Sequence, residues 1–193
     1  MDIVNYIESS RENLEKLKNV DFFSSFNESA HLLLGAINNG GSILVCGNGG
    51  SHSDAQHFAG ELVNYFTKEH KALSVITLGT NSAVASAWSN DHGFEEQFSR
   101  EVEAYGCENS VLLGITTSGK SKNVNLAFEK AEKMGMKTIA LTSDRAKIHL
   151  FPKVDVIIPV PVEETHKIQE CHIVIYHALC VFIENELTQD FLS

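Results

Sequence analysis

The chain has 193 residues, of which 43% are hydrophobic and 21% are charged. This length and apolar content fit one globular domain, residues 1–193, that can bury a substantial core. The formal net charge of −10 excludes nonspecific nucleic-acid binding, which relies on clustered Lys and Arg. No apolar stretch approaches the length of a membrane span, so we expect no membrane partner. Any anionic ligand must therefore be held locally.

The N-terminal residues carry acids and lack a basic start followed by an apolar core, so they do not resemble a signal peptide. The cysteines show no CxxC pairing, and two of them lie inside apolar runs, where a thiol behaves as a small hydrophobe. We therefore expect a cytoplasmic protein with reduced, buried thiols at Cys46, Cys107, Cys171 and Cys180.

Two amphipathic segments, residues 2–17 and 22–38, begin the chain. No strand precedes them, so they cannot be crossover helices between parallel strands. We expect residues 1–40 to form a helical pair that packs as an outer layer or against another subunit.

From residue 41 onward, short runs rich in Val, Ile and Leu alternate with amphipathic segments. This alternation predicts an α/β core over residues 41–193, in which helices cover both faces of a parallel sheet. We expect strands at residues 42–46, 73–78, 111–115, 138–142 and 154–160, and helices at 51–66, 82–87, 94–104, 121–134 and 164–187.

A glycine-rich turn, Gly47-Asn48-Gly49-Gly50, joins the first predicted strand to a helix that starts at Ser51. Such a turn gives backbone room for an anion at the positive end of a helix. It is equally consistent with a tight connection that binds nothing. On that helix, His57 and Glu61 lie four residues apart and share one face, where they could bind a divalent metal, divide acid and base duties, or form a surface hydrogen bond.

A second polar turn, residues 114–121, matches the Walker A pattern of triphosphate-binding loops. However, Gly114 lies inside an apolar run, and no other run supplies the acidic strand end that such proteins need. The shorter loop from Thr116 to Ser121 is rich in hydroxyl groups. That composition suits one phosphate monoester, although a polar turn capped by Ser121 is the simpler alternative.

The last predicted helix is strongly apolar but carries Gln169 and His177. The ordinary explanation is a surface amide and a hydrogen-bonded core histidine. The same ordinary explanation applies to His52, His70, His92, His149, His166 and His172.

Four ordered segments, CGNGGSHSDAQHFAGEL, SNDHGF, GITTSGKS and KIQECHIVIYH, together resemble the sugar isomerase (SIS) domain family. The resemblance implies a flavodoxin-like three-layer α/β/α sandwich with a five-stranded parallel sheet. It also implies a homotetramer, with the N-terminal helices used in oligomerisation and with active sites shared between subunits. The implied activity converts sedoheptulose 7-phosphate into glycero-manno-heptose 7-phosphate through an enediol, for bacterial lipopolysaccharide or capsule.

The resemblance also implies the roles of individual residues. It makes Glu61 the base and His177 the acid, and it predicts a zinc site formed by His57, Glu61, Gln169 and His177. The implied substrate contacts are Asn48, Gly49, Gly50, Ser51, Glu61, Asn90, Asp91, Thr116, Thr117, Ser118, Ser121 and Gln169.

Three positions depart from the family pattern, and they make the choice of sugar open. Tyr65 stands where many relatives have Arg. His166 stands where relatives often have Ala or Asp, and Lys167 replaces the Arg of the family's frequent RIQE segment. Two other functions are alternatives: a noncatalytic partner of the bacterial replication initiator, and a phosphosugar-sensing module. Because the chain retains both Glu61 and His177, we expect an enzyme.

Overall fold

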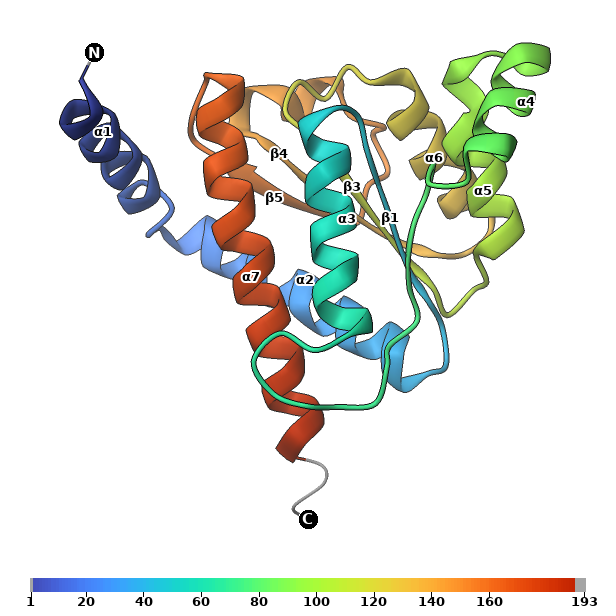
Figure 1. The fold of residues 1–193 in the computed structure, drawn as a ribbon, viewed down its shortest axis with the longest axis horizontal. Helices are drawn as coiled ribbons and strands as arrows, with labels where there is room; N and C mark the ends of the chain where they lie inside the picture. The colour runs from blue at the N-terminus through green and yellow to red at the C-terminus, as the bar shows by residue number, and fades with distance from the viewer. Residues whose placement is uncertain (1, 190–193) are drawn as a thin grey trace.

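The computed structural model describes residues 2–189, which form a three-layer α/β/α sandwich (Figure 1). All five strands are parallel, in the order β2-β1-β3-β4-β5. The sequence therefore predicted the fold class and the sheet correctly. The strands are β1 (Ile43–Gly47), β2 (Val75–Thr77), β3 (Val111–Thr116), β4 (Lys137–Ser143) and β5 (Val156–Val160).

Successive strand residues point to opposite faces of the sheet, so each strand supplies two cores. Val45 and Leu113 pack beneath α2 (Val20–Asn38), α3 (Gly50–Val63) and α7 (Thr165–Gln189). Leu44 and Leu112 pack beneath α5 (Gln97–Tyr105) and α6 (Lys122–Lys133) on the other face. The near-continuous apolar strands follow from this burial on both sides.

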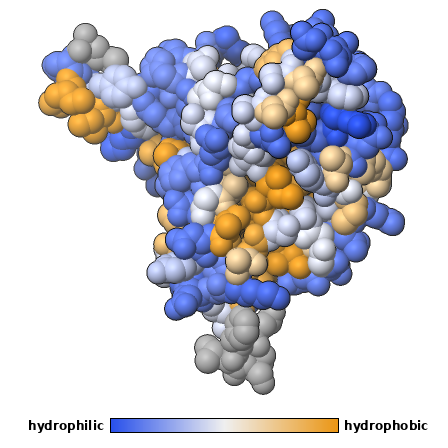
Figure 2. All heavy atoms as spheres, turned by 45° about the vertical axis from the view of Figure 1, so that its right-hand side comes forward, coloured by the Kyte–Doolittle hydropathy of each residue, from blue (hydrophilic) through white to orange (hydrophobic). Residues whose placement is uncertain are grey.

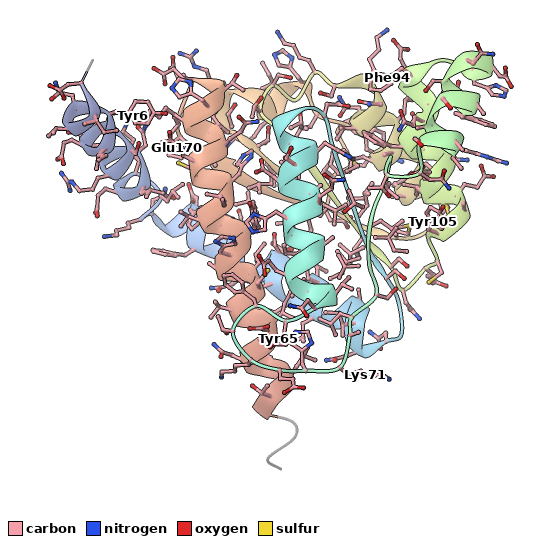
Figure 3. All side chains as sticks on the ribbon, viewed as in Figure 1. Tyr6, Tyr65, Lys71, Phe94, Tyr105 and Glu170 are labelled. Carbon is pink, nitrogen blue, oxygen red and sulfur yellow. The ribbon has the colours of Figure 1, made fainter. Side chains whose placement is uncertain are left out.

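The N-terminal helix α1 (Ile3–Glu15) projects from the body of the molecule and contacts α7 (Figure 1). Figure 3 shows Tyr6 facing Glu170, and the Tyr6 hydroxyl donates to Glu170 Oε1 at 2.5 Å. Figure 2 shows apolar side chains on this projecting arm, at the upper left. The exposed apolar residues of α1 include Ile3, Val4 and Ile7.

The C-terminal ends of α3 and α4 lie several residues from their predicted positions, and the structure gives a reason for each. The helix α3 ends at Val63 rather than at residue 66, because the amides of Phe66 and Thr67 donate to Glu184 on α7. The helix α4 (Ser82–His92) continues past residue 87, and Gly93 ends it at φ 95°. Two short 3-10 helices, η1 (Phe94–Glu96) and η2 (Asp144–His149), complete the described elements.

Within residues 2–189, no helix is both long and apolar enough to cross a membrane. The four cysteines are all free. Cys46, Cys171 and Cys180 are buried as expected, whereas Cys107 is exposed, so the expectation was wrong for that residue.

Candidate active site

The glycine-rich turn lies where the strand order reverses, between β1 and its neighbour β3. In open parallel sheets this switch point, at the carboxyl ends of the strands, is the usual place for a ligand. Gly49 has φ 56°, a backbone conformation that residues other than glycine rarely adopt. It is the N-cap residue of α3. The N-terminus of α3 therefore lies at the switch point, where the amides of Ser51 and His52 donate to the carbonyls of Asn48 and Gly49.

The hydroxyl-rich turn lies at the other side of the same switch point. Thr116 ends β3, and its Oγ1 accepts from the Gly119 amide at 3.2 Å and lies 3.4 Å from Ser121 Oγ. Ser121 precedes α6, but its side chain does not cap the helix. Ser121 is thus the N-cap residue, as the alternative expected, but its hydroxyl faces Thr116 in the loop and makes no capping hydrogen bond.

A reciprocal amide pair fastens the two turns together. Asn48 Nδ2 donates to Asn123 Oδ1, and Asn123 Nδ2 donates to Asn48 Oδ1, both at 2.9 Å. Asn123 is only 3% exposed and lies in the first turn of α6. The sequence analysis missed Asn123, since its partner is 75 positions away and no local pattern identifies it.

A hollow of about 260 Å³ opens beside the first turn. Asn90 and Asp91 do not line it; they lie exposed at the end of α4, where Asn90 donates to Asp91. His52, which the sequence analysis left as an ordinary histidine, does line it. The lining residues are Gly47, Asn48, Gly49, His52, Gly79, Phe94, Gln97 and Phe98, of which Phe94 is labelled in Figure 3.

Two histidines and a carboxylate meet where α3 and α7 pack side by side. One ligand atom from each of His57, Glu61 and His177 lies within 4.8 Å of the other two. His57 Nε2 is 2.8 Å from Glu61 Oε1, and the rings of His57 and His177 are 5.0 Å apart. The structure thus brings together three of the four predicted metal ligands, and we call them the three-residue group.

Aromatic neighbours surround this group. The Tyr176 hydroxyl lies 2.9 Å from His57 Nδ1, and the Phe66 ring packs 4.9 Å from the His177 ring. Burial, with the nearby charge of His57, lowers the pKa of His177, so its imidazole is neutral at pH 7. His177 Nε2 is buried and has no hydrogen-bond partner among residues 2–189. A neutral, unpartnered imidazole nitrogen is the form that binds a metal.

Gln169, on α7, lies against the N-terminal end of α3, whereas Glu61 lies near the C-terminal end of α3. The Gln169 amide occupies the space that a Cβ on Gly50 would fill. Gly50 precedes His57 by seven positions, which is about 10 Å along a helix. The role of Gln169 as a metal ligand stays a prediction. Its contact with Gly50 favours its other predicted role, beside the substrate.

The two residues of α7 that depart from the family pattern, His166 and Lys167, contact α1. Lys167 is 4% exposed and donates to Ser10 Oγ at 2.7 Å, and its ammonium lies over the Tyr6 ring. The His166 ring stacks on Tyr6 at 6.2 Å. Neither residue therefore reaches the polar turns of its own chain, whereas Tyr65 is 47% exposed near the end of α3 (Figure 3).

His172 follows the ordinary explanation only in part, because it is a core residue but neither ring nitrogen has a hydrogen-bond partner among residues 2–189. His172 is fully buried on α7, and burial lowers its pKa to about 3, so it is a neutral core residue. Asp54 likewise has one oxygen buried without a partner, and burial raises its pKa to about 6. It precedes His57 by one helical turn, and nothing in the sequence indicated its burial.

This fold and its paired polar turns define a SIS domain, and the profile of that family matches residues 5–143. The phosphoheptose isomerase of Helicobacter pylori (strain P12) is 47% identical over 178 residues, which cover 92% of this chain and 89% of that protein. The chain belongs to the phosphoheptose isomerases of the SIS domain family.

Two solved structures of the same family support this assignment. A phosphoheptose isomerase from Francisella tularensis is 37% identical, with a TM-score of 0.88 over 95% of this chain and 96% of that one. The phosphoheptose isomerase from Neisseria gonorrhoeae is 36% identical, with a TM-score of 0.86 over 95% of this chain and 97% of that one. Because each match covers 95% of this chain, the likeness includes residues beyond 143, where the match to the family profile ends.

Proposed function

We propose that the chain interconverts sedoheptulose 7-phosphate and D-glycero-D-manno-heptose 7-phosphate, an aldose–ketose isomerisation of bacterial heptose biosynthesis. The observation that carries the proposal is the three-residue group of His57, Glu61 and His177. It lies in a chain that is 47% identical to a phosphoheptose isomerase. The neighbouring polar turns offer a place for an anionic sugar end. Substrate phosphate and reacting carbons lie at opposite ends of such a sugar, which suits two separate polar regions.

Thr116, Ser118 and Ser121 bind the phosphate in this proposal. Their hydroxyls lie before the N-terminus of α6, whose partial positive charge favours an anion. The first turn and Gln169 hold the sugar chain, because the Gln169 amide lies against Gly50. The further substrate contacts in the proposal are Asn48, Gly49, Ser51, Asn90, Asp91 and Thr117.

The three-residue group fits a zinc ion. Two imidazoles and one carboxylate form a common ligand set of catalytic zinc sites, which keep a further position open. The buried, unpartnered Nε2 of His177 fits the same role. A bound zinc ion would supply positive charge against the negative charge that develops on the sugar oxygens. Gln169 remains the proposed fourth ligand.

Glu61 is the proposed base. It removes the proton from the first carbon of the ketose and returns it to the second, while the proton on the first oxygen moves to the second oxygen. His177 is the proposed group that carries the oxygen proton. Its lowered pKa means that it starts neutral; with Nε2 on a metal, its Nδ1–H would donate the proton to the second oxygen and the ring would then regain a proton from the first oxygen. Glu61 is one quarter exposed, which leaves it accessible to a substrate.

We also propose a homotetramer with shared active sites, located in the cytoplasm. The apolar surface of α1 and a groove of about 440 Å³ between α2 and α7 support a second copy as the partner. Phe23 and Val174 line this groove and are half exposed. The free thiols fit a reducing compartment.

A proton-exchange assay with sedoheptulose 7-phosphate in deuterated water tests the proposal. We expect deuterium in the recovered sugar together with the heptose product, a large loss of both after treatment with a chelator, and recovery on addition of zinc. Exchange without any effect of chelator would contradict the role of zinc but not the isomerase. Neither exchange nor product in the zinc-loaded chain would contradict the isomerase itself and would favour a noncatalytic sugar-phosphate binder.

A further inference from the structure

Tyr176 is fully buried, yet its hydroxyl has a specific partner. The hydroxyl lies 2.9 Å from His57 Nδ1, and the two rings meet edge to face with centroids 5.5 Å apart. Tyr176 directly precedes His177 on α7. One turn of α7 therefore supplies both a member of the three-residue group and a hydrogen bond to another member.

The two ring nitrogens of His57 have different partners, which determines where its proton lies. Nε2 is 2.8 Å from Glu61 Oε1, and an ionised carboxylate only accepts hydrogen bonds. When the His57 imidazole is neutral and no metal is bound, Nε2 therefore carries the proton, and Nδ1 accepts a hydrogen bond from the Tyr176 hydroxyl.

A metal bound at Nε2 would reverse this arrangement. It would take the lone pair of Nε2, so the single proton of a neutral imidazole would then lie on Nδ1. Nδ1–H becomes a donor, and the Tyr176 oxygen can accept from it, because a phenol hydroxyl both donates and accepts. The number of protons on the imidazole is unchanged: Nε2 loses one and Nδ1 gains one.

We propose that Tyr176 is a positioning residue for His57, which holds the ring in one orientation and satisfies Nδ1 in both the metal-free and the metal-bound protein. This inference rests on the zinc site of the proposed function. Partners of this kind orient metal ligands, and their loss typically weakens metal binding about 10–100-fold.

The surroundings of Tyr176 keep its hydroxyl in the form that this role needs. Burial, with the nearby charge of Asp54, raises the pKa of Tyr176, so the hydroxyl stays protonated at neutral pH. The Phe58 ring packs edge to face on Tyr176 at 6.3 Å and keeps the ring in place. Only the hydroxyl faces a polar partner, so its removal should leave the apolar packing intact.

The first test compares zinc affinity in Tyr176→Phe and in the unaltered chain, by competition with a chromophoric zinc chelator. We expect Tyr176→Phe to bind zinc about 10–100-fold more weakly. The matched control is Tyr6→Phe, which also removes a hydroxyl bonded to α7 but at Glu170, away from the three-residue group. Equal zinc affinity in Tyr176→Phe and the unaltered chain would overturn the inference.

The second test needs no variant and follows the ¹⁵N resonances of His57 in the unaltered chain during zinc titration. We expect Nδ1 to be unprotonated without metal and protonated with zinc. A proton on Nδ1 in the metal-free chain would also overturn the inference. If both tests give the expected results but the unaltered, zinc-loaded chain shows no isomerase activity, the proposed function alone would be contradicted.

Discussion

The two polar regions of this molecule are built in different ways. The switch-point region consists of two turns whose backbone, hydroxyls and helix N-termini face one another across β1 and β3, joined by the Asn48–Asn123 pair. The three-residue group lies on the flank of two packed helices and consists only of side chains. The first is held by local chain geometry, whereas the second depends on the register between α3 and α7.

This difference separates binding from chemistry. Backbone amides and hydroxyls hold an anion without titrating near pH 7, so the switch-point region suits a sugar phosphate. Imidazoles and carboxylates exchange protons and bind metals, so the three-residue group suits the isomerisation. Substitutions in the two regions should therefore affect different measurements.

The largest effect is expected from Glu61→Gln, which is nearly isosteric and removes the base. Turnover should fall ~10²-fold or more, because general base catalysis contributes about that factor. Steady-state isomerase kinetics measure it, and the control is Glu129→Gln, which removes an exposed i,i+4 partner of Lys133 on α6. Near-normal turnover in Glu61→Gln would refute the assignment of the base.

A smaller effect, on substrate binding rather than on turnover, is expected from Ser121→Ala in the switch-point region. Loss of one hydrogen bond to a charged phosphate should weaken substrate binding ~10-fold or more, since such bonds contribute about 1.5–3 kcal/mol. Zinc affinity should not change. Substrate titration and chelator competition check the two parts, with Ser99→Ala on α5 as the control for loss of an exposed hydroxyl. Weakened zinc binding in Ser121→Ala would show that the two regions are not independent.

The sequence predicted the switch-point region better than the three-residue group. The five strands, the glycine-rich turn and the loop from Thr116 to Ser121 follow from local composition and periodicity, because each is a continuous segment. The i,i+4 spacing of His57 and Glu61 was equally visible, but spacing alone left a surface hydrogen bond open. Only the family resemblance joined His177 to them.

What the sequence could not supply is the pairing between distant segments. Asn123, Tyr176 and Glu184 each contact a residue at least 75 positions away, and none belongs to a recognisable motif. The end of α4 was missed for a related reason. Stacking of Trp88 on His92, with Arg100 over the Trp88 ring, supports helical residues that propensity alone does not favour.

Glu184→Gln tests whether the three-residue group depends on the loop after α3. The buried carboxylate accepts from the amides of Phe66, Thr67 and Lys68, and burial opposes its ionisation while these bonds lower its pKa overall. An amide accepts at only one oxygen, so unfolding should become easier by roughly 1–3 kcal/mol. Urea unfolding measures this loss.

The same variant should loosen Phe66 from the His177 ring, against which it packs. Hydrogen exchange at the amides of Phe66 and Thr67 should become faster, and zinc affinity should fall by a small factor. Binding of inorganic phosphate at the switch point should be unchanged. Slow exchange at these amides in Glu184→Gln would mean that other contacts hold the loop.

The smallest effect is expected from Asp54→Asn, measured without metal. Burial raises the pKa of Asp54 from its ordinary 3.8 to about 6, with the charge of His57 opposing the shift. The folded chain therefore holds the proton more tightly than the unfolded chain. Below about pH 4, ionisation of Asp54 does not lower the free energy of unfolding. Between about pH 4 and pH 6 it lowers this free energy progressively, and above about pH 6 the loss is complete.

A shift of two units corresponds to nearly 3 kcal/mol, but Asp54 is only half-buried, so we expect about 1 kcal/mol after screening by solvent. Asparagine does not titrate in this range. The unaltered chain should therefore lose stability relative to Asp54→Asn as the pH rises from 4 to 7, and urea unfolding midpoints at several pH values measure the difference. Because Asp54 lies one turn from His57 and is not a hydrogen-bond partner of the second polar turn, phosphate binding should not follow this pH dependence. A stability difference that is constant from pH 4 to pH 7 would mean that Asp54 reaches solvent in the folded chain.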